Sequence, residues 1–145
     1  MKKQEKEMCG CPIRYGMGMF GDKWTLLIIR DMMFMGKRYY NEFLNSEENI
    51  STNILADRLA CLEKNGIVSK TMDEKNRSKY IYSLTKKGKE LLPVMLSIVD
   101  WSEKYDEKTR VPEDFANKVR QNPKRLMKEM LKAMENGEPV VKCKE

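Results

Sequence analysis

The sequence predicts an α+β protein that is mostly helical, built as a winged helix-turn-helix with N-terminal and C-terminal dimerisation helices. Two observations carry this prediction: three helical segments follow one another between residues 23 and 64, and a pair of short strands with a basic loop comes after them. At 145 residues the chain is long enough for one domain with its own core. We expect residues 1–105 to form the winged helix-turn-helix with its dimerisation segments. Residues 106–145 should form a C-terminal helical extension.

A short N-terminal helix and the central helix, which is the first of these three, are predicted from proline placement and apolar periodicity. Pro12 should open a short helix, because proline is favoured in a first turn where its missing N–H has no partner. Residues 23–35 are apolar on nearly every face, which is typical of a buried central helix. After a glycine break, residues 39–44 should form the second helix. The stripe expected to face the core of the central helix comprises Trp24, Leu27, Ile28 and Met32.

The third helix is marked at both ends. Ser51 suits the N-cap, since its hydroxyl can accept from an unpaired N–H, and Gly66 suits a left-handed stop after Lys64. Leucines at i, i+4 and i+7 indicate the buried side, which comprises Leu55, Leu59 and Leu62. The side expected to face outward comprises Asn53, Ala56, Asp57, Ala60 and Lys64, with Thr52 and Arg58 at its margins.

A β-hairpin should follow this helix. Residues 67–72 and 80–84 are rich in β-branched and aromatic side chains, and the polar loop 73–79 joins them. Three basic side chains recur every second residue in that loop, so in an extended segment they would project on one side. These are Lys75, Arg77 and Lys79.

Two longer helices are expected after the hairpin. Thr85 should cap a helix that runs to Tyr105 and is kinked by Pro93, because proline removes one backbone hydrogen bond. A last amphipathic helix is expected from about Pro112 to Met134. The segment before Gly21 and the helices after Thr85 have more apolar positions than a three-helix core with a hairpin can cover, which predicts a homodimer formed through them. The positions expected to need a partner are Leu92, Leu96, Val99 and Trp101.

Composition narrows the class of protein. The net charge of +6 suits a polyanionic partner such as double-stranded DNA. No apolar run resembles a membrane span or a signal peptide, so we expect a cytoplasmic protein without membrane association. Histidine is absent, which excludes Ser-His and Cys-His nucleophile pairs and imidazole-dependent zinc sites; we therefore expect no enzyme. The cysteines, expected to be reduced thiols, are Cys9, Cys11, Cys61 and Cys143.

The third helix and the hairpin loop carry the candidate DNA contacts. Asn53 could bond adenine through two hydrogen bonds, Thr52 could meet a thymine methyl group or a phosphate, and Arg58 could reach a phosphate or guanine. The alternative is that these side chains simply solvate a helix and a loop. The full set of candidate DNA-binding residues is Arg38, Ser51, Thr52, Asn53, Arg58, Lys75, Arg77 and Lys79.

Over about residues 11–101 the chain resembles the HxlR family of winged-helix regulators. The matching residues are Cys11-Pro12, Lys23-Trp24, Gly36, Tyr40, Glu42, Ile50-Ser51, Leu55, Arg58-Leu59, Leu62-Glu63, Gly66, Tyr82-Ser83-Leu84-Thr85, Gly88, Pro93 and Trp101. The resemblance implies a cytoplasmic dimer whose first and last helices pair and which binds an operator with inverted half-sites. It also implies a response to electrophiles or oxidants through the cysteine at the position of Cys11.

The chain departs from the family pattern at several places. Tyr39 stands where the family usually has an arginine, and the basic Lys37 and Arg38 lie upstream of it. The connector before the third helix carries Glu47 and Glu48. Arg77 and Ser78 replace the usual prolines of the wing. Operator sequence cannot be transferred from the family because of these differences.

Glycine, cysteine and methionine patterns in the sequence suggest other kinds of site. Gly16, Gly18 and Gly21 spell G-x-G-x-x-G, but no strand precedes them, so a dinucleotide site is not expected. Cys9 and Cys11 are too few ligands for a metal site, and no cofactor is expected. A methionine-lined pocket for a small-molecule effector stays open beside the reading of these residues as core. Its candidate residues are Met17, Met19, Met32, Met33, Met35 and Met95.

These observations predict a sequence-specific DNA-binding transcriptional regulator that acts as a homodimer on an inverted repeat. The alternative is a winged-helix protein-interaction module that does not read DNA. Cys11 is the candidate redox-sensing thiol, because it precedes Pro12 and so should cap the first helix, where the helix dipole favours a thiolate. A simple capping or packing role for Cys11 is the alternative.

Overall fold

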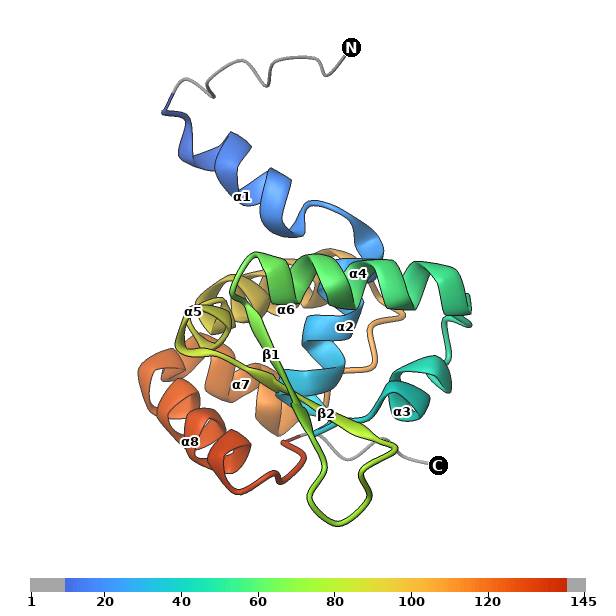
Figure 1. Ribbon diagram of the computed structural model, residues 1–145. Coiled ribbons are helices and arrows are strands. Elements are labelled where there is room, and N and C mark those ends of the chain that lie inside the picture. The colour runs from blue at the N-terminus through green and yellow to red at the C-terminus, as the bar shows by residue number, and fades with distance from the viewer. Residues whose placement is uncertain (1–9, 141–145) are drawn as a thin grey trace.

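The computed structural model describes residues 10–140, in which the other helices and a two-stranded sheet are arranged around the central helix of residues 23–34 (Figure 1). The elements are α1 (Pro12–Phe20), α2 (Lys23–Phe34), α3 (Tyr40–Leu44), α4 (Thr52–Lys64), β1 (Val68–Met72), β2 (Tyr80–Leu84), α5 (Lys86–Lys89), α6 (Leu92–Tyr105), α7 (Glu113–Gln121) and α8 (Pro123–Glu135). Helices α3 and α4 form the helix-turn-helix, and the antiparallel pair β1–β2 forms the wing. The predicted winged helix-turn-helix is confirmed.

The predicted helix boundaries in the first half of the chain match the structure. Pro12 lies in the first turn of α1, and Ser51 caps α4 by accepting a hydrogen bond from the Ile54 N–H at 3.3 Å. Gly66 has a φ of +71°, in the left-handed region that favours glycine after a helix end. Sequence did not reveal the cap of α2, where the Asp22 carboxylate accepts from the Thr25 N–H at 3.0 Å.

Helix α2 is the centre of the core, as expected, but its buried side differs from the predicted stripe. Ile29 and Met33 are fully buried, whereas Trp24 and Leu27 are only half-buried. The leucine stripe of α4 is confirmed, because Leu55, Leu59 and Leu62 are all buried against the same core. This stripe fixes which side of α4 faces outward.

Each of the two predicted long helices after the wing is divided into two at a proline. Pro93 lies in the first turn of α6 and does not kink a continuous helix, so the segment from Thr85 gives the short α5 and then α6. Pro123 likewise begins α8, and the Asn122 side chain caps that helix by accepting from the Arg125 N–H at 3.3 Å. Proline has no N–H to donate, and its ring fits a first turn better than a helix interior.

The C-terminal helices share one core with the helix-turn-helix. Phe34 of α2 meets Phe115 of α7 edge to face, with ring centroids 6.1 Å apart. Leu92 and Leu96 are 1% and 3% exposed within the single chain. The expectation that these two leucines need a second chain to cover them is therefore wrong; α7 and α8 pack against α6 instead.

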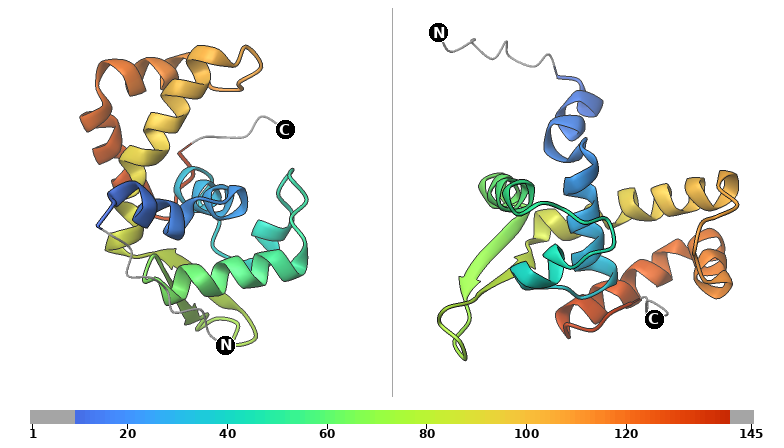
Figure 2. Two further views of the ribbon diagram at one scale, coloured as in Figure 1. Left: turned by 90° about the horizontal axis from the view of Figure 1, so that it is seen from above. Right: turned by 90° about the vertical axis from the view of Figure 1, so that its right-hand side faces the viewer.

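The helix-turn-helix with its wing and the C-terminal helices lie on different sides of the molecule. Figure 2 shows α4 and the wing on one side and α7 with α8 on the other, while α1 projects from the body. No helix between residues 10 and 140 combines the length and apolar character needed to cross a bilayer.

Candidate nucleic-acid interface

The N-terminal end of α4 is open to solvent and held in place from behind. Ser51, Thr52 and Asn53 are all exposed. The Tyr40 hydroxyl donates to the Thr52 carbonyl at 3.1 Å, which joins α3 to the first turn of α4. The amide of Asn53 makes no hydrogen bond to another residue of the 10–140 segment, so it is free to contact a ligand. The remaining outward residues are Ala56, Asp57, Ala60 and Lys64, all exposed as predicted.

A network of charged side chains braces the turn between α3 and α4. Asp31 is 2% exposed and accepts hydrogen bonds from Arg30, from the Lys37 ammonium at 3.3 Å and from the Ser46 hydroxyl. Arg30 also donates to Glu48, and this hydrogen bond holds the pKa of Glu48 below its ordinary value. Glu48 thus adds no unpaired negative charge beside α4. The Lys37 ammonium is likewise bound within the protein, by Asp31 and Ser46.

Arg58 is engaged within the protein. Its Nε donates to Asp22 Oδ1 at 3.1 Å, and its terminal nitrogen pairs with Asp57. The hydrogen bond to Asp22 is the main reason why the pKa of Arg58 is raised. Burial raises the pKa of Asp22, but hydrogen bonds from Thr25 and Arg58 outweigh it and hold that pKa below its ordinary value. A DNA contact by Arg58 would therefore compete with its ion pairs to Asp22 and Asp57.

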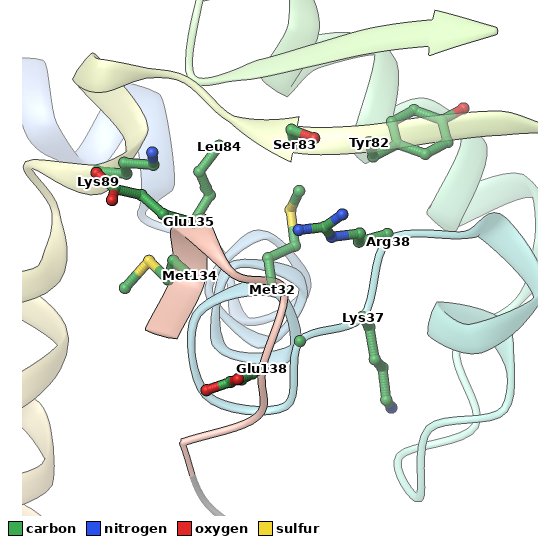
Figure 3. A pocket seen from close by; sticks show the side chains of 12 residues that line it. Met32, Lys37, Arg38, Tyr82, Ser83, Leu84, Lys89, Met134, Glu135 and Glu138 are labelled. Carbon is green, nitrogen blue, oxygen red and sulfur yellow. The ribbon is translucent and has the colours of Figure 1, made fainter. Parts of the chain in front are cut away.

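Arg38 lies on another part of the surface. Its carbonyl accepts from the Tyr82 N–H at 2.8 Å, and its backbone N–H donates to Glu42 at 3.2 Å. The guanidinium lies against the backbone of Gly137 and lines a cavity beside the C-terminal segment (Figure 3). This placement does not support the DNA contact predicted for Arg38.

The wing loop is folded into turns, so the prediction from alternate spacing in an extended segment is wrong. The Asp73 carboxylate accepts from the Lys75 N–H at 2.9 Å, and the Asn76 side chain accepts from the Ser78 N–H at 3.2 Å. Such side-chain turns reverse the chain within a few residues. The three predicted basic residues are nevertheless all exposed at this end of the wing: Lys75, Arg77 and Lys79.

Tyr39 ties the wing loop to the helix-turn-helix. Its hydroxyl donates to Asp73 Oδ2 at 3.0 Å, and the Lys79 ammonium lies 5.6 Å from the centroid of its ring. The hydrogen bond to Asp73 raises the pKa of Tyr39, while the Lys75 N–H and then the Tyr39 hydroxyl lower the pKa of Asp73. The residue that replaces the family's usual arginine thus positions the wing. Sequence reasoning missed this role.

Lys70 is a second residue that sequence reasoning missed. It is exposed on β1, and its ammonium lies 4.3 Å from the centroid of the Tyr80 ring on β2. Strand register explains the contact, because Lys70 faces Tyr82 across the ladder and Tyr80 is the next residue on the same face. The sequence signal that could have identified Lys70 is its place in a predicted strand next to the basic loop.

Cys11 and the glycines of the G-x-G-x-x-G pattern lie in or next to α1. Cys11 is exposed at the N-cap of α1, as predicted, with no hydrogen bond from its sulfur to the helix. Cys9 and Cys143 lie outside the described residues. Gly16 and Gly18 lie inside α1, which is no phosphate-binding loop. Within residues 10–140 no three acidic or cysteine side chains gather as a metal site.

The predicted methionine pocket does not form as one site. Met33 and Met95 are core residues, and Met17 is 56% exposed on α1. Of the six named methionines, Met32 alone lines one of the two described cavities, where it is joined by Met134 of α8.

Comparison with known proteins agrees with this geometry. The family model described as HxlR-like helix-turn-helix matches residues 19–110. The uncharacterised HTH-type transcriptional regulator YdeP of Bacillus subtilis (strain 168) is 32% identical over 99 residues, which cover 68% of this chain and 77% of YdeP. The regulator YodB of the same organism is 34% identical over 98 residues, covering 67% of this chain and 87% of YodB.

Solved structures show the same likeness. The reduced form of B. subtilis YodB superposes with a TM-score of 0.56 at 30% identity, covering 68% of this chain and 97% of YodB. The redox regulator HypR in its oxidised form gives a TM-score of 0.57 at 33% identity, covering 65% of this chain and 96% of HypR. The match leaves α7 and most of the C-terminal extension outside the family model. By the extent of the family match and the identity to its relatives, this chain belongs to the HxlR-like helix-turn-helix family.

Proposed function

We propose that this protein is a transcriptional regulator that binds double-stranded DNA through α4 and the wing. The observation that carries this proposal is that α4, with its exposed N-terminal end, and the wing, with its exposed basic loop, lie on the same side of the molecule (Figure 2). An α-helix fits the major groove, and a wing beside it can reach the backbone or minor groove. The named relatives are transcriptional regulators, which supports the same function here.

Each side chain on this surface has a role that follows from its chemistry. Asn53 is exposed and free to pair with adenine, whose N6 and N7 match an amide. Ser51 and Thr52 lie at the helix N-terminus, where backbone N–H groups favour a phosphate. The wing residues Lys75 and Arg77 neutralise further phosphates without reading sequence.

The charge on this surface favours DNA over a protein partner. The exposed cations of α4 and the wing are Lys64, Lys70, Lys75, Arg77 and Lys79. Against them stand Glu63 and Glu74, while Asp57 is paired with Arg58 and Asp73 with the wing backbone and Tyr39. A protein-interaction module would have no need of this excess of positive charge beside a free asparagine.

We also propose a homodimer, formed through α1 and α6. Helix α1 has no buried residue in the single chain, and Ile13 and Met17 on it are 72% and 56% exposed. On α6, Ile98, Trp101 and Tyr105 are exposed, Trp101 by 65%. Exposed apolar side chains of this size are typical of a subunit interface.

A redox response through Cys11 is part of the same proposal. Cys11 is exposed on α1, the helix assigned above to the dimer contact, so modification of its sulfur would add bulk there. The similarity to HypR, which is a redox regulator, supports this role. A Cys11→Ser protein that still releases DNA under a mild oxidant would remove it.

The test of DNA reading is selection of bound fragments from a random DNA pool, followed by affinity measurements on the selected site. Asn53→Ala should relax preference at one base position by about 1–3 kcal/mol, because one amide pairs with one base. Arg77→Ala should weaken all sequences alike and lower the salt slope by about 1.

Lys128→Ala is the matched control for the loss of one positive charge. Lys128 is exposed on α8, on the other side of the molecule from the wing, so both affinity and salt slope should stay as in the wild type. Failure to select any fragment, or equal effects of Arg77→Ala and Lys128→Ala, would overturn the proposed interface.

A further inference from the structure

A cavity lies between the base of the wing and the C-terminal segment. Its volume is about 340 Å³, which is in the range of small-molecule sites. Helix α2 and the turn after it form one wall, β2 forms the second, and the end of α8 with Gly137 and Glu138 forms the third (Figure 3). The third wall comes from the part of the chain beyond the family match, so the cavity belongs to this chain and its extension.

The C-terminal segment is fixed against the helix-turn-helix by close backbone contacts. Val140 donates its N–H to the Phe34 carbonyl at 2.8 Å. Gly36 and Gly137 both have a φ of +66°, and a Cβ on Gly36 would lie 3.4 Å from the Gly137 carbonyl oxygen. These glycines allow the two turns to approach closely, and both glycines line the cavity.

The deeper charges that line the cavity are positive. Arg38 and Lys89 are half-buried, whereas Glu135 and Glu138 are exposed. Lys37 also lines the cavity, but its ammonium is bound to Asp31 and Ser46. In Figure 3 the side chain of Lys37 accordingly extends away from the others.

Between residues 10 and 140, no group accepts a hydrogen bond from the Arg38 guanidinium. It lies against Gly137, where a Cβ would come within 2.6 Å of one of its nitrogens, yet it donates no hydrogen bond to a group of residues 10–140. A half-buried cation without an acceptor has lost part of its hydration, and no hydrogen bond to the protein replaces that loss. A planar guanidinium is suited to a carboxylate, which can accept two of its N–H groups at once.

The rest of the lining is apolar. In Figure 3, Leu84 of β2 and Met32 of α2 extend into the space near the Arg38 guanidinium, and Met134 lies on the α8 side. Leucine and methionine side chains favour an aliphatic or aromatic body, and methionine adapts to its shape. The lining therefore offers one anion-binding end and one apolar end.

We propose that this cavity binds a small organic carboxylate, with the carboxylate on the Arg38 guanidinium and the apolar body against Met32, Leu84 and Met134. Binding of this kind is separate from DNA recognition and is measured on the free protein. Its effect on DNA rests on the function proposed above. The Arg38 carbonyl holds the Tyr82 N–H of β2, and the next residue, Tyr39, holds Asp73 of the wing, so a ligand on Arg38 contacts the segment that positions the wing.

The experiment is a titration of the uniformly ¹⁵N-labelled full chain, without DNA, with 3-phenylpropionate, hexanoate and indole-3-acetate in turn. At least one carboxylate should shift the Arg38 Nε–H and the Tyr82 amide resonances together, with saturation. The neutral alcohol of the same body should bind roughly tenfold or more weakly, because it cannot form the charge-assisted pair. Absence of saturable shifts at both positions with all three carboxylates would overturn the proposal.

Two variants make the test specific. Arg38→Gln should weaken carboxylate binding roughly tenfold or more while the melting temperature stays close to that of the wild type, since the guanidinium bonds no group in the described part of the chain. Arg125→Gln is the matched control, because Arg125 is 76% exposed on α8 and does not line the cavity. Equal affinity of wild type and Arg38→Gln, or of carboxylate and alcohol, would also overturn the proposal. Neither result bears on DNA binding.

Discussion

Asp22 and Arg58 are the residues through which the start of α2 is connected to α4. One carboxylate caps α2 through Thr25 and also accepts from Arg58, 36 positions later in the chain. The two uses of this carboxylate can be separated by substitution, because serine is also a good N-cap but carries no charge.

Asp22→Ser should therefore keep α2 intact and release Arg58 from this partner. A released guanidinium can neutralise one more phosphate, so the salt slope of DNA binding should rise by about 1. Fluorescence anisotropy at several salt concentrations measures it. Asp22→Ala is the control that loses the cap as well, at about 1 kcal/mol of stability. An unchanged slope for Asp22→Ser would mean that Arg58 stays away from the DNA.

Glu48 gives a prediction on pH. The hydrogen bond from Arg30 lowers the pKa of Glu48 in the folded protein, so the pair stabilises the fold fully above the ordinary glutamate pKa. That stability is lost as the pH falls through the lowered value. Glu48→Gln should cost roughly 1 kcal/mol at pH 7 and progressively less below pH 4 or so.

Urea unfolding at a series of pH values measures this difference. Glu47→Gln is the matched control, since Glu47 is the exposed neighbour with no ion pair among the described residues. A constant gap between wild type and Glu48→Gln from pH 7 to pH 3 would contradict the assigned pairing.

Single residues were predictable from sequence where the chemistry is local. Ser51 as a cap and Asn53 on the outer face of α4 follow from spacing along one helix, and the structure has both in these positions. Tyr39 was not predictable, because its partner Asp73 lies 34 positions away and only the fold brings them together. Arg38 was assigned to the DNA side for the same reason, since sequence cannot show the glycine against which it lies.

At the scale of whole elements, proline was the signal that sequence reasoning used incompletely. Pro93 was expected to kink a helix and Pro123 was overlooked, yet both begin a new helix. The apolar period continues across each break because the separate helices face the same core, so periodicity alone suggests one long helix. The wing strands and the four helices before them were predictable, since each has local start and stop signals.

The Asn122 cap at the start of α8 leads to a prediction about the stability of the C-terminal extension. Asn122→Ala should cost about 1 kcal/mol, because the Arg125 N–H loses its acceptor at the start of α8. Thermal unfolding followed by circular dichroism measures this loss. Asn117→Ala, at an exposed position inside α7, is the matched control and should leave the melting temperature unchanged or raise it slightly. A loss confined to an early, separate transition would mean that α8 unfolds independently of the core.

In the whole molecule, the elements proposed to contact DNA, the helices proposed to form the dimer and the C-terminal extension lie at different places (Figure 2). Leu92 and Leu96 are buried in the core of the single chain, so the apolar surface left on α6 is smaller than the sequence suggested and consists of the face around Trp101. Trp101 and Tyr105 lie together there, with ring centroids 5.4 Å apart. A face of this kind can be self-complementary across a two-fold axis.

Trp101→Glu should accordingly convert a dimer into a monomer at micromolar concentration, because a carboxylate would be buried without a partner in each copy of the interface. Sedimentation velocity measures the change. Met72→Glu is the matched control, since Met72 is 52% exposed at the end of β1 next to the wing loop, outside the helices proposed for the dimer contact. A two-fold dimer would set half-site centres about 34–36 Å apart or a multiple of that. DNA affinity of the monomer should then fall by about 10²-fold or more, because each subunit binds its half-site alone. A wild type that sediments as a monomer, or a Trp101→Glu protein that stays dimeric, would remove α6 from the interface.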